Sequence, residues 1–390
     1  MRGGTEEGFF PMGNWQEHVA PWVRAIERRY DAWKYRLYYA LGGPGPIRIQ
    51  PYRGYGTRER VHVFGRVLEE RGVKPPSETD RWWHNLLNMV RRLQSREVPY
   101  ARLEVRAAGV EREVIADEEG MFDVWLEPGP KAVDGRPGQP VEIELVEPLS
   151  RRQPGPVQAT GEILIPSPEA QFGVISDLDD TVIQSDVSSL IQMAHTVLFG
   201  NARTRMPLPG AAAFYRALRA GAGGGVNPLF YVSNGLWNLY DLLEDFFALN
   251  HMPDDPVILL RNWGVYHDEI LPTRQRGHKL DIIQPILDLY EDLPFILIGD
   301  SSEADPEIYH ELVQVYGKRI LAVYIRNVSR DLDRPAVIRK LADEIVDAGS
   351  ELVLAEDSWS LARHAARQGW IDELAVGEIR AEQLSQESSG

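Results

Sequence analysis

Residues 172–186 read FGVISDLDDTVIQSD, and no other stretch of the chain says as much about its fold and chemistry. The mostly apolar run 172–175 predicts a buried strand. Two carboxylates, Asp177 and Asp179, follow this strand, with Thr181 two positions further on. A carboxylate at such a strand end can attack phosphorus and form a covalent intermediate. The second carboxylate is placed to give a proton to the leaving alkoxide.

This D-x-D-x-T spacing resembles the first motif of the haloacid-dehalogenase (HAD) superfamily, which mainly hydrolyses phosphate esters through an aspartyl-phosphate. Two like charges this close disfavour the ionisation of both, so we expect Asp179 to hold the proton needed by a general acid. The second aspartate also separates the motif from the dehalogenase branch, which lacks it. The alternative interpretation is an acidic turn after a strand, without any chemistry.

Length and composition indicate a globular protein. A chain of 390 residues is long enough for two or three domains, and its contents of 43% hydrophobic and 26% charged residues are typical of a soluble protein. No stretch approaches the ~20 apolar residues of a membrane span, and no N-terminal signal peptide is recognisable. We therefore expect a cytoplasmic location, with peripheral membrane contact left open. The absence of cysteine excludes disulfides, thiolate zinc sites and cysteine nucleophiles.

The net charge of −16 is unevenly distributed. Residues 1–170 contain 24 basic and 25 acidic side chains, whereas residues 171–390 contain 18 and 33. The excess of acid therefore lies in the half that carries the two-aspartate motif. A surface of this sign disfavours nucleic acid as a partner. Nothing in the sequence indicates the oligomeric state.

Periodicity and composition divide the chain into four parts. These are an N-terminal helical segment, a β-rich accessory domain, an α/β domain and a polar C-terminal tail, at residues 1–45, 46–165, 166–370 and 371–390. Aromatic residues recur at helical spacing between Trp15 and Leu37, which predicts a helix packed on the protein or seated at a lipid surface. Alternating segments in the second part predict a small β-sandwich with a helical insert at 81–94.

The third part alternates strands with helices, which predicts a parallel sheet covered by helices on both faces. The HAD resemblance implies that this sheet is Rossmannoid. Strands are expected at 172–176, 228–232, 257–261, 294–298, 320–325 and 351–354. Helices are expected at 185–199, 210–220, 237–249, 279–291, 304–316, 335–348 and 358–368. In such sheets catalytic residues gather beyond the carboxyl ends of the strands.

Polar residues follow one further predicted strand and begin one helix. Ser233, Asn234 and Gly235 follow the strand 228–232, where a hydroxyl and N–H groups at a helix start can bind phosphate. An N-cap serine is the alternative. Lys279 stands at a predicted helix start, where the dipole disfavours a cation, so we expect an anion such as a phosphoryl group beside it. A solvated surface lysine is the alternative.

Another strand end carries carboxylates. The segment 299–309 reads GDSSEADPEIY, in which Asp300 and Asp305 bracket a loop that enters a helix. Carboxylates at a strand end are suited to Mg²⁺. Each feature is weak alone. A nucleophile pair, a serine, a lysine and an acidic loop in this order together favour one phosphatase site.

The chain also resembles one family within the superfamily. ISDLDDT, YVSN with LWNLYD, HK before a long helix, GDSSEADPEIY and AVYIRNV, between about Gly161 and Val328, are similar to the App1-like phosphatidate phosphatase catalytic domain. The resemblance implies a Mg²⁺-dependent phosphatase that acts on phosphatidate or a related lipid phosphate through an aspartyl-phosphate. In it Asp177 is the nucleophile and Asp179 the acid and base.

The motifs and the resemblance together give three groups of candidate residues. The catalytic candidates are Asp177, Asp179, Thr181, Ser233 and Lys279. The substrate-binding candidates are Ser233, Asn234, Gly235, Lys279 and Trp237. The candidate Mg²⁺ ligands are Asp177, Asp179, Asp300 and Asp305.

Two departures from the family lie near the expected substrate mouth. Gly235 and Leu236 stand where Ser-Pro is frequent, and Ser302 and Glu303 stand where Gly-Gln is commoner. Both leave the catalytic positions filled and put the specificity in doubt. No independent cap domain is expected after the first motif, so the open site suits a large substrate. Two other functions stay open: a phosphatase for phosphoproteins or small phosphomonoesters, and a catalytically silent module that binds a membrane or a protein.

Overall fold

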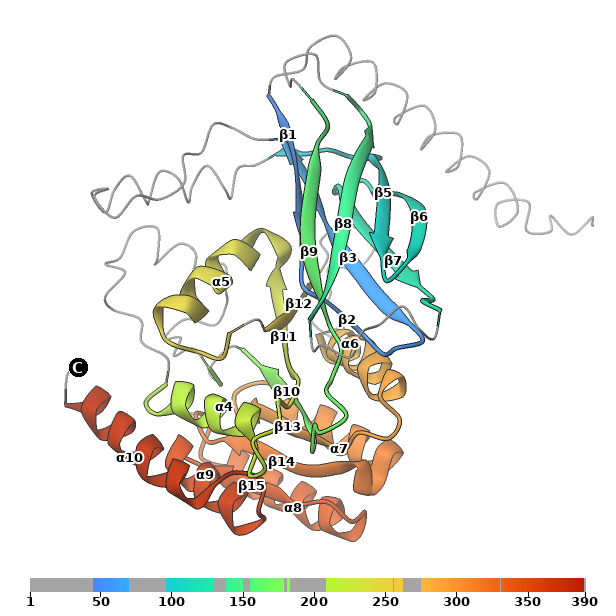
Figure 1. The fold of residues 1–390 in the computed structure, drawn as a ribbon. Coiled ribbons are helices and arrows are strands. Elements are labelled where there is room, and N and C mark those ends of the chain that lie inside the picture. Colours follow the sequence, from blue (N-terminus) through green and yellow to red (C-terminus); the bar gives the residue numbers. More distant parts are fainter. Residues whose placement is uncertain are drawn as a thin grey trace, which may run out of the picture.

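The computed structural model consists of a β-rich unit and an α/β unit (Figure 1). The described residues are 45–69, 96–129, 138–149, 155–178, 181–182, 208–254, 256–261, 275–329 and 331–388. The helices predicted at Trp15–Leu37, 81–94 and 185–199 lie outside these ranges. Among the described residues, no helix is both long and apolar enough to cross a bilayer.

The β-rich unit is one sheet of nine strands in the order β1-β3-β2-β9-β8-β5-β6, with β4 and β7 also paired to β3. Its strands are β1 Ile47–Pro51, β2 Gly54–Gly56, β3 Val61–Glu69, β4 Arg96–Glu97, β5 Arg102–Ala107, β6 Val110–Ile115, β7 Met121–Leu126, β8 Gly138–Glu147 and β9 Gln158–Leu164. The short strand β2 pairs with both β3 and β9. The strands of this unit are therefore paired into one continuous sheet, whereas we expected a small β-sandwich.

The α/β unit contains a parallel sheet of six strands in the order β12-β11-β10-β13-β14-β15. Its strands are β10 Gly173–Asp177, β11 Leu229–Leu236, β12 Val257–Arg261, β13 Phe295–Asp300, β14 Ile320–Arg326 and β15 Leu352–Ala355. Counted along the chain this order is 3-2-1-4-5-6, the order of doubly wound sheets, in which the winding reverses between the first and fourth strands. Those strands are β10 and β13, and they end at Asp177 and Asp300.

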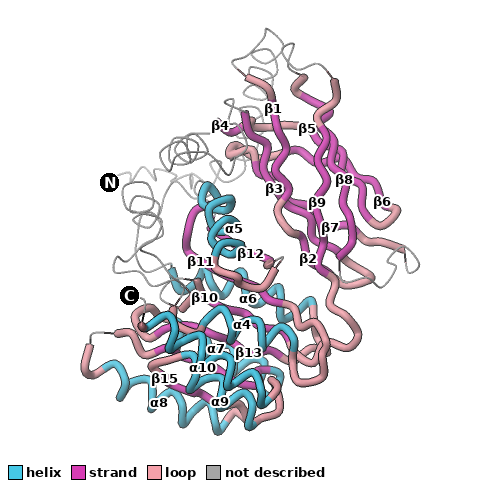
Figure 2. Tube along the Cα trace, turned by 60° about the vertical axis from the view of Figure 1, so that its left-hand side comes forward, coloured by secondary structure: helices cyan, strands magenta, loops and turns pink. Residues whose placement is uncertain are grey.

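Two groups of helices cover this sheet (Figure 2). The helices α4, α9 and α10 pack together, and α6, α7 and α8 form the second group. The helices are α4 Ala211–Ala220, α5 Tyr240–Leu249, α6 Gln275–Leu289, α7 Asp305–Tyr316, α8 Arg334–Asp347, α9 Ser358–Arg367 and α10 Glu373–Glu387. Because both faces are covered, the central strands are apolar along their length, and β13 is buried at every position.

All six predicted strands are present, but three boundaries differ from the expectation. Strand β11 continues through Leu236, and α6 begins at Gln275, so Lys279 lies one turn inside its helix. The predicted polar tail instead contains helix α10. Only Ile379 and Gln383 of this helix are buried. The Asp372 side chain caps the helix by accepting a hydrogen bond from Leu374 N.

Aromatic side chains join the two units. The ring of Tyr52, in the β-rich unit, stacks on Trp237 with centroids 4.6 Å apart. Tyr55 meets Phe230 of β11 edge to face at 5.6 Å. These residues belong to the same hydrophobic cluster as the core of the α/β unit. The β-rich unit is therefore fixed against β11 and the segment that follows it.

Helix α10 offers a matched test of its docking. Ile379 is fully buried, whereas Leu374 in the same helix is 80% exposed. Ile379→Ala should lower the free energy of unfolding by about 2–5 kcal/mol, because it removes a packed side chain between helices. Leu374→Ala should change it by less than about 0.5 kcal/mol. Urea unfolding monitored by circular dichroism measures both, and equal effects would contradict this packing.

Candidate active site

Asp177 ends β10 in a rigid, buried position. Its side chain is 1% exposed. The hydroxyl of the preceding Ser176 donates to the Asp177 carbonyl at 2.7 Å and also lies 2.6 Å from the Tyr215 hydroxyl. Asp177 Oδ1 is 2.8 Å from Lys279 Nζ. The candidate nucleophile is thus held at the end of its strand and paired with a cation.

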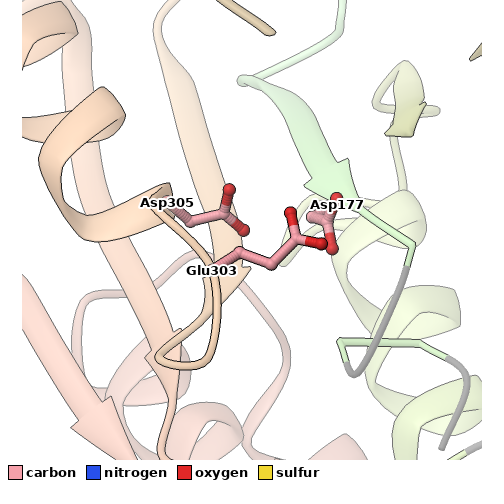
Figure 3. Close-up of side chains that lie close together, drawn as sticks. All are labelled: Asp177, Glu303 and Asp305. Atoms are coloured by element: carbon pink, nitrogen blue, oxygen red, sulfur yellow. The ribbon is translucent and has the colours of Figure 1, made fainter. Parts of the chain in front are cut away.

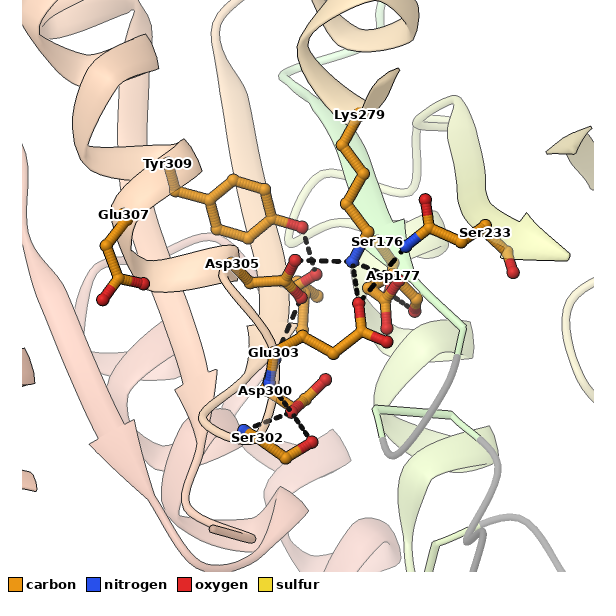
Figure 4. Close-up of polar contacts among 12 residues, drawn as sticks. Ser176, Asp177, Ser233, Lys279, Asp300, Ser302, Glu303, Asp305, Glu307 and Tyr309 are labelled. Carbon is orange, nitrogen blue, oxygen red and sulfur yellow. Dashed lines mark hydrogen bonds and ion pairs between the residues drawn. The ribbon is translucent and has the colours of Figure 1, made fainter. Parts of the chain in front are cut away.

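Lys279 is the centre of the site (Figure 4). Its ammonium group lies 2.8 Å from Asp177, 2.9 Å from Glu303 and 2.5 Å from Asp305. Burial lowers the pKa of this lysine, but the three carboxylates outweigh that effect and hold the pKa well above its ordinary value. Lys279 is therefore charged. The anions beside Lys279 in the structure are these carboxylates. Because α6 begins at Gln275, the prediction that Lys279 stands at a helix start is wrong.

Asp300 organises the acidic loop after β13. Its Oδ1 accepts hydrogen bonds from Ser302 N and Ser302 Oγ at 2.5 Å and from Glu303 N at 3.1 Å. Its Oδ2 is buried without a hydrogen-bond partner among the described residues. Burial and the neighbouring Asp305 raise the pKa of Asp300 to about 7. One oxygen of Asp300 thus shapes the turn while the other stays available to a ligand.

Asp305 begins α7 and connects the loop to Lys279. Its Oδ1 accepts from Lys279 Nζ, and its Oδ2 accepts from Asp300 N at 3.3 Å. The carboxylate lies directly over Gly299, where an added Cβ would come within 2.4 Å of Asp305 Oδ2. Glycine is required at this position because any side chain would displace Asp305.

Arg334 holds the same loop from its other side. Its guanidinium donates to the carbonyl oxygens of Ser301 at 3.0 Å and Glu303 at 2.7 Å, and it pairs with both carboxylate oxygens of Glu307. These contacts fix the backbone of the loop. They leave the side chain of Glu303 to reach toward Asp177 (Figure 3).

The donor set fits a magnesium ion. Asp177, Glu303 and Asp305 each have a carboxylate oxygen within 4.8 Å of the others. The buried carboxylates of Asp177 and Asp305 are hard oxygen donors that suit Mg²⁺, whereas the partly exposed side chain of Glu303 is free to turn toward solvent. The partnerless Oδ2 of Asp300 adds a further donor at the neighbouring strand end. The sequence motifs predicted Asp177, Asp300 and Asp305 as site residues. Glu303 was noted only as a departure from a family, although its acidic side chain three positions after Asp300 could have indicated that it belongs to the site.

The serine segment of β11 lies beside this cluster, but not at a helix start. Ser233 is fully buried, and its Oγ accepts from Gly235 N at 3.0 Å. Because β11 runs on through Leu236, Ser233 is neither a helix N-cap nor part of a helix N-terminus. Asn234 Nδ2 lies 3.4 Å from Glu303 Oε2, which brings this segment into contact with the acidic loop.

The remaining candidates have three different outcomes. Thr181 is buried, and its hydroxyl has no hydrogen-bond partner among the described residues. Asp179 lies outside the described residues. Trp237 packs against Tyr52 and Phe64 at the junction of the two units. Trp237 therefore helps to join the two units, and its contact with substrate stays a prediction.

Comparison with known proteins identifies the segment that contains this cluster. Residues 172–327 match the family model described as phosphatidate phosphatase APP1, catalytic domain. This segment is App1-like. Phosphatidate phosphatase APP1 of Saccharomyces cerevisiae is 30% identical over 178 residues, which are 45% of this chain and 29% of that protein. An uncharacterized protein of Schizosaccharomyces pombe is 32% identical over 165 residues, 41% of this chain and 26% of its own.

The chain thus spans less than a third of the length of these two relatives. Among solved structures, a carbohydrate acetylesterase from Xanthomonas citri overlaps with a TM-score of 0.32 at 9% identity, covering 84% of this chain and 75% of that one. A TM-score this low carries no argument about fold or function. The App1-like assignment therefore rests on the sequence of the segment that carries Asp177, Lys279 and Asp305.

Replacing Lys279 tests whether its ammonium group stabilises the buried carboxylates of the site. Lys279→Met removes the ammonium group that contacts both Asp177 and Asp305, so these buried carboxylates lose its compensation. We expect the free energy of unfolding to fall by about 3 kcal/mol or more. The exposed Lys318→Met should change it by less than about 0.5 kcal/mol. Chemical unfolding measures the difference, and similar values for both variants would show that Lys279 does not occupy this position.

Proposed function

We propose that this chain is a Mg²⁺-dependent phosphatase of the HAD type, acting through an aspartyl-phosphate on phosphatidate or a related lipid phosphate. The observation that carries the proposal is the position of Asp177. It ends β10 at the point where the winding of the sheet reverses, in contact with Lys279 and opposite an acidic loop. The App1-like sequence of this segment supports the same activity.

In the proposed reaction, a carboxylate oxygen of Asp177 forms a bond to phosphorus while the ester P–O bond breaks. Asp179 gives its proton to the departing alkoxide. Water then attacks phosphorus and loses a proton to Asp179, and the bond to Asp177 breaks to release inorganic phosphate. Lys279 offsets the negative charge of the nucleophile and of the phosphoryl oxygens.

Asp177 and Asp300 would hold the Mg²⁺ ion, with Asp305 beside them. When bound, the ion supplies positive charge that reduces the repulsion between the carboxylates and the incoming phosphate. The buried Oδ2 of Asp300 supports this assignment, because a buried carboxylate oxygen without a hydrogen bond is costly unless a ligand compensates it.

Asp177→Asn tests the covalent step. The amide keeps the size of the side chain and removes the nucleophile, so kcat for a phosphomonoester should fall by roughly a thousandfold or more. Asp281→Asn, an exposed substitution on α6, should leave kcat within about twofold. Fluoroberyllate should protect the wild-type chain from thermal unfolding when Mg²⁺ is present, and should not protect Asp177→Asn. Near-normal turnover of Asp177→Asn would reject this mechanism.

The substrate class is tested by comparing phosphatidate in vesicles with soluble p-nitrophenyl phosphate, each with Mg²⁺ and with excess EDTA. We expect a higher kcat/KM for phosphatidate, sedimentation of the chain with the vesicles, and no phosphate release in EDTA. An equal or higher kcat/KM for the soluble ester without sedimentation would reject the lipid assignment and leave a phosphatase for small esters or phosphoproteins. No release from either substrate would favour a silent binding module.

A further inference from the structure

The side chain of Glu303 contacts two donors, Lys279 and Asn234, that the sequence predicts to bind substrate. Its Oε2 accepts from Lys279 Nζ at 2.9 Å and lies 3.4 Å from Asn234 Nδ2. Lys279 and Asn234 come from α6 and β11, which are far apart along the chain, yet they converge on this one oxygen. A carboxylate oxygen therefore sits where a phosphoryl oxygen would receive the same two contacts.

Glu303 differs from the rest of the cluster in its exposure. Its side chain is 36% exposed, whereas those of Lys279, Asp177 and Asp305 are 2% exposed or less. The backbone at Glu303 is held by Arg334 and by the carboxylate of Asp300. Glu303 can therefore leave the cluster by rotation of its side chain alone, while the loop stays in place.

The charge of the cluster opposes the simultaneous presence of Glu303 and phosphate. Three carboxylates already surround one ammonium group, so negative charge is in excess before any substrate arrives. A phosphate monoester brings further negative charge to the same ammonium group. Charges only a few ångströms apart in a partly dehydrated site interact strongly, so the two anions compete for Lys279.

We propose that Glu303 is a specificity-determining residue that competes with phosphate for Lys279 and Asn234 and must swing aside when a phosphate group binds. This inference rests on the proposed function, because it takes Lys279 and Asn234, two of the predicted substrate-binding residues, as the phosphate subsite. It also gives a function to the negative charge that this chain carries at position 303. An amide at this position would add no negative charge and could donate a hydrogen bond to phosphate.

The consequence is selectivity against small anions. Inorganic phosphate offers nothing beyond its contacts with the subsite, so it bears the full cost of displacing Glu303. A larger substrate can offset that cost through contacts made by its leaving group. The wild-type chain should therefore bind its own inorganic product weakly.

The test measures binding of inorganic phosphate to the full chain by calorimetry in the presence of Mg²⁺. Glu303→Gln keeps the shape of the side chain and removes its charge, so its Kd for phosphate should be lower by roughly tenfold. Glu356→Gln is the matched control. It removes the same charge from an exposed residue directly after β15, at the same edge of the sheet, and should leave Kd within about twofold.

Two further readouts separate competition from other roles of Glu303. The Kd for Mg²⁺, titrated without phosphate, should not rise in Glu303→Gln, and KM for p-nitrophenyl phosphate should fall with little change in kcat. Weaker Mg²⁺ binding without tighter phosphate binding would overturn the inference and make Glu303 a metal ligand. An unchanged Kd for phosphate, or no phosphate binding by either chain, would also overturn it. Tighter phosphate binding without hydrolysis by the wild-type chain would instead reject the proposed function.

Discussion

The site depends on one buried ammonium group. Lys279 holds together carboxylates that come from three separate places: the end of β10, the loop after β13 and the start of α7. Without a cation, these groups could not share a buried volume, because each would carry the cost of losing water without compensation. The parallel sheet places the strand ends side by side, and Lys279 converts this proximity into a fixed arrangement. The rest of the loop geometry, including the turn at Asp300 and the clamp by Arg334, is built around that contact.

The β-rich unit also supports the site, because it packs against β11. Tyr52 and Tyr55 pack on Trp237 and Phe230, and Phe230 belongs to β11, the strand that carries Ser233 and Asn234. A change in this aromatic contact would therefore move the candidate phosphate donors, although the contact lies outside the cluster. This gives the accessory unit a physical role in positioning β11, which its strand pattern alone did not indicate.

The sequence predicted those parts of the fold that depend on a local pattern of apolar or polar residues. Apolar runs predicted all six strands of the parallel sheet, because strands buried on both faces must be apolar throughout. Asp177, Asp300 and Asp305 were recognisable because each stands at a strand end or a helix start. Glu303 was not, because its partner Lys279 is distant in sequence. Helix α10 was missed because it buries so little apolar surface. The packing role of Trp237 was not predicted because its stacking partner, Tyr52, is in the other unit.

The charges of the site also restrict where binding energy for a substrate can come from. The half of the chain that contains the site is acidic, and its carboxylates outnumber the ammonium group that they surround. The net charge of this half therefore does not favour long-range attraction of a phosphate, in contrast to phosphate sites built from several basic residues. In the proposed phosphatase, a phosphate would instead be held by short contacts with Lys279 and the proposed Mg²⁺ ion, and those contacts would be needed in the transition state. Affinity for the ground state then has to come from the non-phosphate part of the substrate, where contacts can be made without opposing this charge. A large leaving group, such as a lipid embedded in a bilayer, can make more of these contacts than the leaving group of a small ester can.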